Sequence, residues 1–304
     1  MRRYFLIASS LALAWPAAAA HAKEPLRLQP SSKWVIDYGD DSCRLARNFG
    51  EGNRKVTLIM DQFEPGDRFK MRLVGKPARG RLARSPIEGR LRFGPNEAET
   101  EVAAMEGTMN ADPVVIFNGA QGLAPLTEAQ AAASKEAWER GAPFAEVIPP
   151  SIGSAREAAV TWVEVTKLLR NDLVLETGPM DKPMDALREC SWDMVAHWGL
   201  NVEQQKGLTR RPIAKARSRP WFSAGDYPES MLRGGHQGIV HFRLMLDARG
   251  TPTSCHIQMS TRPKEFDDVV CQAIMKRARF DPALDAQGKP VASYWVQTVL
   301  FRME

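Results

Sequence analysis

The last quarter of the chain carries the pattern that most constrains its fold: two alternating runs joined by a turn, one amphipathic helix and a final apolar run. Residues 238–246 alternate apolar side chains with a period of two, which predicts a strand with one buried face. Residues 247–250 form a turn signal that ends in glycine, and the return strand is expected at 251–259. Apolar residues at helical spacing predict a helix over 264–279. The β-branched and aromatic run at 293–303 completes a ββαβ module.

Short motifs in this stretch carry a resemblance to a known family. They are Tyr227-Pro228, Gly238-x-Val240, Leu246-Asp247-x-x-Gly250, Cys255, Cys271, Arg277-Ala278-Arg279-Phe280-x-Pro282-Ala283 and Gly288-x-Pro290-Val291. In their order and spacing they resemble the TonB C-terminal domain, in particular the cysteine-bearing TonB-like domains of alphaproteobacterial envelope proteins. The resemblance covers about residues 220–304. An unrelated ββαβ module is the alternative.

The resemblance implies a way of binding. TonB C-terminal domains receive a short extended peptide beside a strand of their small sheet, so that main-chain hydrogen bonds supply affinity and alternate side chains supply selectivity. In this chain it implies that the final strand makes the contact, through Tyr294, Val296, Thr298, Val299, Leu300 and Phe301. The implied partner is an envelope protein, such as an outer-membrane receptor peptide. The alternative is that the strand is only structural.

The start of the chain has the three parts of a secretory signal peptide. Arg2 and Arg3 form a basic start, residues 4–15 are apolar, and Ala20-His21-Ala22 is a small-x-small cleavage site. We therefore expect residues 1–22 to be removed and the protein to reach the periplasm with no integral membrane span. An uncleaved anchor is the alternative, although the apolar core is short for a span.

The four cysteines are even in number, which in an exported chain predicts disulfides. Cys255 and Cys271 fall in the same small module, on a strand and on the helix expected to cover it, so we pair them. That leaves Cys43 to pair with Cys190. A zinc site is the alternative, but no CxxC spacing or histidine cluster accompanies the cysteines.

Residues 23–205 read as a larger, antiparallel β-rich domain, which makes the whole chain α+β. Short alternating runs separated by turn signals predict strands, at 33–38, 42–49, 55–63, 69–73, 90–93, 99–105, 113–118, 159–165 and 172–177. A capping-box pattern starts a helix at Thr127, expected to end near Arg140. A closing helix is expected over 182–198. A Cys43–Cys190 bond would tie that helix to the first strands.

The segment between the two domains, residues 206–219, is basic. Its six cations are Lys206, Arg210, Arg211, Lys215, Arg217 and Arg219, and prolines interrupt any helix there. We expect a solvated, extended connector, and the alternative is a contact strip for anionic headgroups or an acidic partner. A second basic run, at 76–92, has the same two interpretations.

No motif indicates catalysis or a cofactor. The chain has no GxSxG elbow, no P-loop and no GxGxxG. Its histidines after the leader, at 197, 236, 241 and 256, lack the spacing of a metal site. Removing residues 1–22 takes away two arginines and no acid, so the formal net charge falls from +5 to +3. That balance does not indicate a nucleic-acid partner.

The sequence therefore predicts a periplasmic, non-enzymatic protein-binding module that engages an envelope protein by β-strand addition. One alternative is an energy-transducing component of TonB-dependent transmembrane transport, although such proteins keep an anchor and a long proline-rich spacer. A second alternative is an envelope hydrolase with its site in residues 23–205, since catalytic groups can meet in space without a sequence motif.

Overall fold

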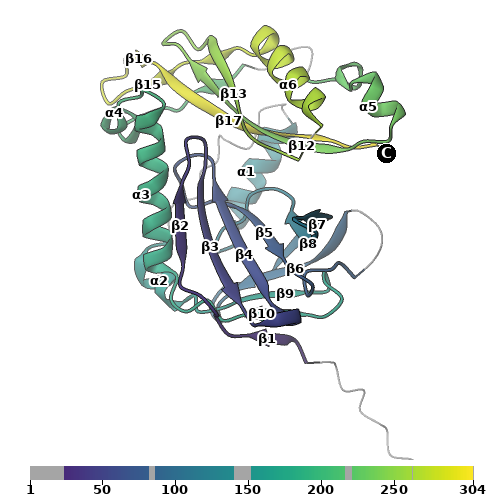
Figure 1. Cartoon of the computed structure of the whole chain (residues 1–304). Coiled ribbons are helices and arrows are strands. Elements are labelled where there is room, and N and C mark those ends of the chain that lie inside the picture. The colour runs from purple at the N-terminus through teal and green to yellow at the C-terminus, as the bar shows by residue number, and fades with distance from the viewer. Residues whose placement is uncertain (1–23, 82–85, 140–151, 216–220, 262, 304) are drawn as a thin grey trace, which may run out of the picture.

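The structure is a computed structural model that describes residues 24–81, 86–139, 152–215, 221–261 and 263–303. A large curled sheet forms the lower body in Figure 1, and a small sheet with one helix lies above it. A long helix runs along one side and leads from the lower body to the upper sheet. The protein is α+β, as the sequence predicts. The predicted signal peptide lies outside the described residues.

The large sheet follows the predicted strands closely and contains one further strand, at residues 26–28, that was not predicted. Its members are β1 (Leu26–Leu28), β2 (Val35–Tyr38), β3 (Cys43–Phe49), β4 (Val56–Gln62), β5 (Lys70–Val74), β6 (Ile87–Phe93), β7 (Thr100–Met109), β8 (Asp112–Phe117), β9 (Val163–Thr166) and β10 (Leu173–Leu175). They lie in the order β1-β10-β9-β6-β7-β8-β5-β4-β3-β2, antiparallel except for β1 and β10. Pro30, just after β1, also bridges to Phe49 on β3, so the sheet curls around a single core.

Three helices accompany this sheet. Helix α1 (Glu128–Glu139) begins with the predicted capping box, in which Thr127 and Gln130 exchange side-chain and backbone hydrogen bonds. Its expected end at Arg140 lies outside the described residues. Helix α2 (Ser154–Ala159) was not predicted, and the strand expected from residue 159 begins only at Val163. Helix α3 (Asp181–His197) is the predicted closing helix.

Helix α3 closes the core of the large sheet. Met184, Leu187 and Met194 point from it into that core and are almost completely buried. Cys190 on the same face forms the predicted disulfide with Cys43 on β3. The bond therefore joins elements that are 147 positions apart in sequence.

The small C-terminal sheet has the predicted ββαβ order. It consists of β12 (Gly238–Leu246), β13 (Pro252–Ser260) and β17 (Ser293–Phe301), in the order β13-β12-β17, with α6 (Lys264–Arg277) on one face. Cys255 on β13 forms the predicted disulfide with Cys271 on α6. Gly250 ends the β12–β13 turn at φ 76°, and a Cβ there would lie 2.1 Å from the Phe280 carbonyl oxygen, so only glycine fits.

The segment between the two sheets departs from the prediction. It contains α4 (Val202–Lys206) and β11 (Ile213–Ala214), and β11 pairs with β14 (Phe280–Asp281) of the C-terminal part. Arg210 bridges to β15 (Ala283–Leu284), which itself pairs with β16 (Pro290–Val291). A solvated connector is therefore wrong for residues 209–215, because their backbone groups find partners in a sheet. Arg217 and Arg219 lie outside the described residues.

The remaining described elements are short: α5 (Glu229–Arg233) and the 3-10 turns at Gly52–Arg54 and Ala224–Asp226. In the described part of the chain, no helix combines the length and apolar character needed to cross a lipid bilayer.

Candidate protein-binding edge

Strand β17 lies at one edge of the C-terminal sheet. Within the described residues it pairs only with β12, along its whole length from Ser293 to Phe301. A strand paired on one side leaves alternate N–H and C=O groups without a ladder partner, which makes it a template for a further strand. The candidate binding strand of the sequence analysis is therefore an edge strand.

Backbone hydrogen bonds of β12 decide which residues of β17 face outward. The Ile239 N–H donates to Thr261 Oγ1 at 2.8 Å, and the Ile239 carbonyl accepts from the Thr261 N–H at 3.0 Å, so Ile239 faces β13. Successive residues of a strand direct these groups to opposite sides, so Val240 faces β17. Val240 lies opposite Val299 in the ladder. Val299 thus bonds inward, and Thr298 presents its N–H and C=O to the free side.

One side-chain face of β17 belongs to the core beneath α6. Trp295 packs against Phe280 with ring centroids 5.0 Å apart, and Phe301 stacks on Phe266 of α6 at 4.3 Å. Val299 lies on the same face and is half-buried. Of the predicted contact residues, Val299 and Phe301 therefore serve the fold with their side chains.

The other side-chain face of β17 is shared between the two sheets. Tyr294 and Val296 are each 7% exposed, because they pack against Phe63, Val195 and neighbouring residues of the large domain. Trp198 at the end of α3 makes an edge contact with Tyr294 at 5.0 Å. Further along the strand, Leu300 is 41% exposed. Side chains open to a partner therefore gather at the end of β17, at Thr298 and Leu300.

The sequence analysis predicts one buried face for β12, and this is wrong. Ile239, His241 and Arg243 on the second face are all below a tenth exposed. His241 packs on Phe63 with ring centroids 4.1 Å apart, and its Nδ1 lies 2.6 Å from Thr298 Oγ1. Burial holds the pKa of His241 well below its usual value, and the charge of Lys70 lowers it further.

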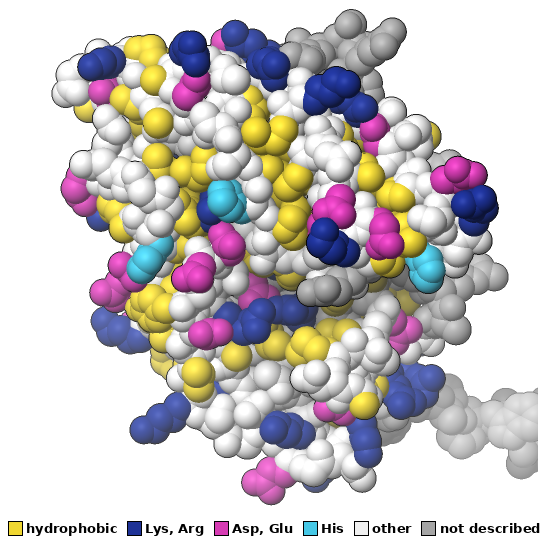
Figure 2. Space-filling view, turned by 45° about the horizontal axis from the view of Figure 1, so that its top comes forward, with side chains coloured by type: hydrophobic (Ala, Val, Ile, Leu, Met, Phe, Trp, Pro, Cys, Tyr) yellow, Lys and Arg dark blue, Asp and Glu magenta, His cyan; other side chains and the backbone are white. Residues whose placement is uncertain are grey.

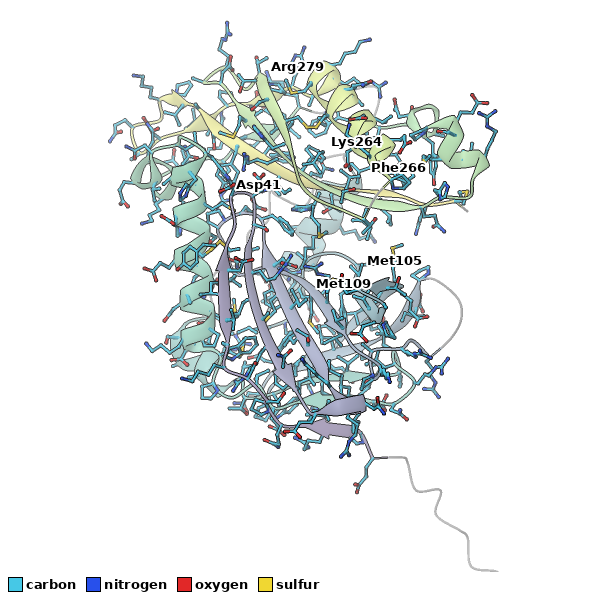
Figure 3. All side chains as sticks on the ribbon, in the orientation of Figure 1. Asp41, Met105, Met109, Lys264, Phe266 and Arg279 are labelled. Atoms are coloured by element: carbon cyan, nitrogen blue, oxygen red, sulfur yellow. A yellow bond between two sulfur atoms is a disulfide. The ribbon has the colours of Figure 1, made fainter. Side chains whose placement is uncertain are left out.

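An ion pair and hydrogen bonds connect the two domains beside His241. The buried Arg243 guanidinium donates to Asp41 Oδ1 at 2.7 Å and lies 4.1 Å from the centre of the Trp198 ring. Gln258 on β13 donates to the carbonyls of Asp41 and Phe63. Figure 3 shows Asp41 at the tip of the β2–β3 hairpin, directly beneath the upper sheet. Sequence reasoning missed the contact because Asp41 and Arg243 are 202 positions apart.

The start of β17 is held by the segment that joins the domains. The buried Gln205 of α4 accepts from Ser293 Oγ at 2.7 Å and donates to the Ala292 carbonyl at 2.9 Å. Arg211 lies 3.7 Å from Glu64 of the large domain. Burial raises the pKa of Tyr294, and the nearby Arg211 opposes that rise. The first residues of β17 are therefore enclosed, whereas its end is open.

A shallow groove of about 470 Å³ lies on the large domain, between β2 and α3. Its lining is mostly apolar, with Trp34, Ile36 and Leu45 on one side and Pro183 and Ala186 on the other. No histidine or carboxylate is among its lining residues. Elsewhere in the described residues, no three His, Cys, Asp or Glu side chains gather closely enough to hold a metal ion.

The surface of the upper sheet and its helix carries apolar side chains between charges of both signs, as Figure 2 shows. Such a mixed surface suits a protein partner better than a polyanion.

Residues 224–303 match the family model of the Gram-negative bacterial TonB protein C-terminal domain. The TonB-like identification of this part of the chain is confirmed. The match begins at residue 224, after the large domain, so it says nothing about residues 24–215. A comparison with curated proteins found no match to the chain.

The TonB C-terminal domain is a protein-interaction and energy-transduction domain, not a catalytic one. Such domains interact with outer-membrane proteins, and their presence implies a place in the cell envelope. For this chain, the match therefore supports a role in envelope protein interaction or transport.

Proposed function

We propose that this protein is a non-enzymatic periplasmic binding protein, whose TonB-like domain captures an extended segment of an envelope protein along the free edge of β17. The observation that carries the proposal is the outward-facing backbone of Thr298, beside the exposed Leu300 at the open end of the strand. Main-chain bonds to such an edge supply affinity without demanding a particular sequence. The backbones of Tyr294 and Val296 continue the same edge toward its enclosed start.

Proline substitution tests this mechanism directly. Thr298→Pro removes an N–H that the sheet does not use, so the fold should survive while the partner is lost. Thr298→Val is the matched control, because it also removes the hydroxyl beside His241 but keeps the N–H. Val299→Pro should instead destabilise the domain, since that N–H bonds to β12.

The readout is crosslinking from position 300 in envelope fractions. A photoreactive residue in place of Leu300 should label the same envelope protein in the wild-type and Thr298→Val backgrounds, and lose it in Thr298→Pro. Thermal melts check that each variant is folded. Full labelling in a folded Thr298→Pro protein would rule out strand addition at this edge.

A component of TonB-dependent transport is the second candidate, and the family match favours it. Energy transduction through the membrane needs an anchor, so the two candidates differ at the start of the chain. N-terminal sequencing of the exported protein decides between them. A mature chain that begins at Lys23 supports the binding protein, and a retained leader supports the transducer.

A further inference from the structure

Strand β2 is a free edge of the large sheet, on the side where α3 runs (Figure 1), and among the described residues it pairs only with β3. The Gly39 N–H donates to the Ser42 carbonyl at 3.1 Å, so Gly39 faces β3. Successive residues of a strand direct these groups to opposite sides, so Asp37 and Val35 also face β3. Ile36 therefore points its N–H and C=O away from the sheet, where no described residue bonds to them.

The groove of about 470 Å³ between β2 and α3 lies along this free edge. Trp34, Ile36 and Leu45 line it from the sheet, and Pro183 and Ala186 of α3 form the facing wall. A concave site of this size with a mostly apolar lining is typical of ligand binding. The edge and the groove therefore form one continuous surface.

A covalent bond and a hydrogen bond hold the two walls of the groove together. Cys190 lies one turn from Ala186 on α3, and its disulfide with Cys43 brings α3 and β3 to a Cα–Cα distance of 5.9 Å. Arg47 Nη1 of β3 donates at 2.7 Å to the carbonyl of Thr177, shortly before α3. Because the walls are fixed before a ligand arrives, binding loses less conformational entropy.

The charged residues that line the groove, Arg47 and Lys182, are both cations. The Arg47 guanidinium lies 5.6 Å from the centre of the Trp34 ring, and it donates through Nε and Nη1 to the carbonyls of Ser32 and Thr177. Its Nη2 makes no hydrogen bond with a described residue, and no described carboxylate pairs with Arg47 or Lys182. A ligand carboxylate would therefore meet positive charge that the fold leaves uncompensated.

An extended peptide fits all of these features together. Its main chain can bond to Ile36, its apolar side chains can enter the groove, and one acidic side chain can face the two cations. A hydrocarbon chain would fill the groove but leave the backbone groups of the edge without partners. Val35 on the opposite face of β2 is 60% exposed, so it can contact the side chains that alternate away from the groove.

We propose that β2 and the groove beside α3 bind an extended segment of a partner protein, with apolar side chains in the groove and an Asp or Glu facing Arg47 and Lys182. The groove lining contains no residue of the C-terminal sheet, so this site is separate from the β17 edge. The large domain thereby has a binding role of its own.

Selection from a displayed library of random peptides, each about a dozen residues long, tests the proposal on the full mature chain. Ile36→Pro removes the outward N–H, and Ile36→Ala is its control, because it shortens the same side chain but keeps the N–H. Selected peptides should bind Ile36→Pro about tenfold more weakly than Ile36→Ala. Ala186→Trp fills the groove and should abolish binding, whereas Glu189→Trp, at an exposed position of the same helix, should not.

A matched pair of peptides tests the charge of the groove. A selected peptide with Glu should bind about two- to fivefold more tightly than its Gln counterpart. This ratio should move toward one in Arg47→Met and in Lys182→Met. It should persist in Lys33→Met, which removes an exposed cation outside the groove lining. A ratio that is the same in all four proteins would overturn the assigned role of the two cations.

Thr298→Pro separates this site from the proposed function, because peptides bound at β2 should bind that variant as tightly as wild type. Peptides that are lost in Thr298→Pro but kept in Ile36→Pro and Ala186→Trp would belong to β17. If every selected peptide behaved so, or if none were enriched, the β2 site would be overturned. Thermal melts check that each variant is folded, and Ala186→Trp still decides the outcome if Ile36→Pro does not fold.

Discussion

His241 illustrates how one buried side chain sets a pH dependence. Its pKa is lowered in the folded protein by burial and, to a smaller extent, by the charge of Lys70. Below a pH of about 6.5 the unfolded chain binds a proton that the folded chain does not, so stability falls as the pH falls. At about pH 5 the loss should reach up to about 2 kcal/mol.

Replacing His241 by Phe should remove this acid-sensitive part of the stability and keep the packing against Phe63. The measurement is urea unfolding of both proteins between about pH 5 and 7.5, with free energies compared at each pH. A difference between the two proteins that does not change with pH would show that His241 titrates normally in the fold.

Arg243 and Asp41 make a second prediction at this scale. Arg243 is 4% exposed and its guanidinium pairs with Asp41, so Asp41→Ala leaves a buried guanidinium without this counterion. The protein should lose about 1–3 kcal/mol. Arg243→Met should cost less, because it removes the buried charge as well as the pair. Equal losses in both variants would mean that lost packing, and not the unpaired charge, dominates.

At the scale of elements, the two disulfides should differ in their contribution. Cys43–Cys190 closes a loop of 147 positions between β3 and α3, and Cys255–Cys271 closes one of 16 between β13 and α6. On the chain-entropy model, their loss costs about 5 and about 3 kcal/mol respectively. Double Ala variants of each pair, unfolded in urea, measure these costs. A larger loss from the short loop would show that local strain or packing outweighs chain entropy.

Strand β11 makes a prediction about where the C-terminal unit begins. Ala214 is 7% exposed in the core under α6, and the Arg210 side chain donates to the Pro282 carbonyl. A fragment of residues 207–304 should therefore melt at a higher temperature than one of residues 220–304. Equal melting temperatures would mean that β11 adds nothing to the folded unit.

At the scale of the whole molecule, we propose that residues 23–205 and 220–304 are two folding units that dock through a shared apolar cluster. Phe63 and Val195 of the first unit meet Tyr294 and Val296 of the second. The isolated C-terminal fragment would expose this face, so it should bind a hydrophobic dye that the full chain does not bind. Added fragment 24–205 should suppress the dye signal, and no suppression would argue against reversible docking.

Local pattern was enough to predict most of the elements. A period of two places the side chains of Val240 and Phe242 on one face of β12, and that rule needs no knowledge of distant residues. The pairing of Cys255 with Cys271 could also be predicted from local sequence, because the two residues fall on adjacent elements of one module. The sequence also revealed the edge strand through its resemblance to a family, now supported by the match over residues 224–303.

Tertiary structure alone decided what covers each face. Periodicity places His241, Tyr294 and Val296 on the second face of the C-terminal sheet. It does not show that the large domain buries this face. That burial depends on segments up to about two hundred positions apart, such as Asp41 and Arg243, and no local pattern encodes such a pairing. The outward N–H of Thr298 follows from the register of β17 on β12, and that register exists only once the C-terminal sheet has formed.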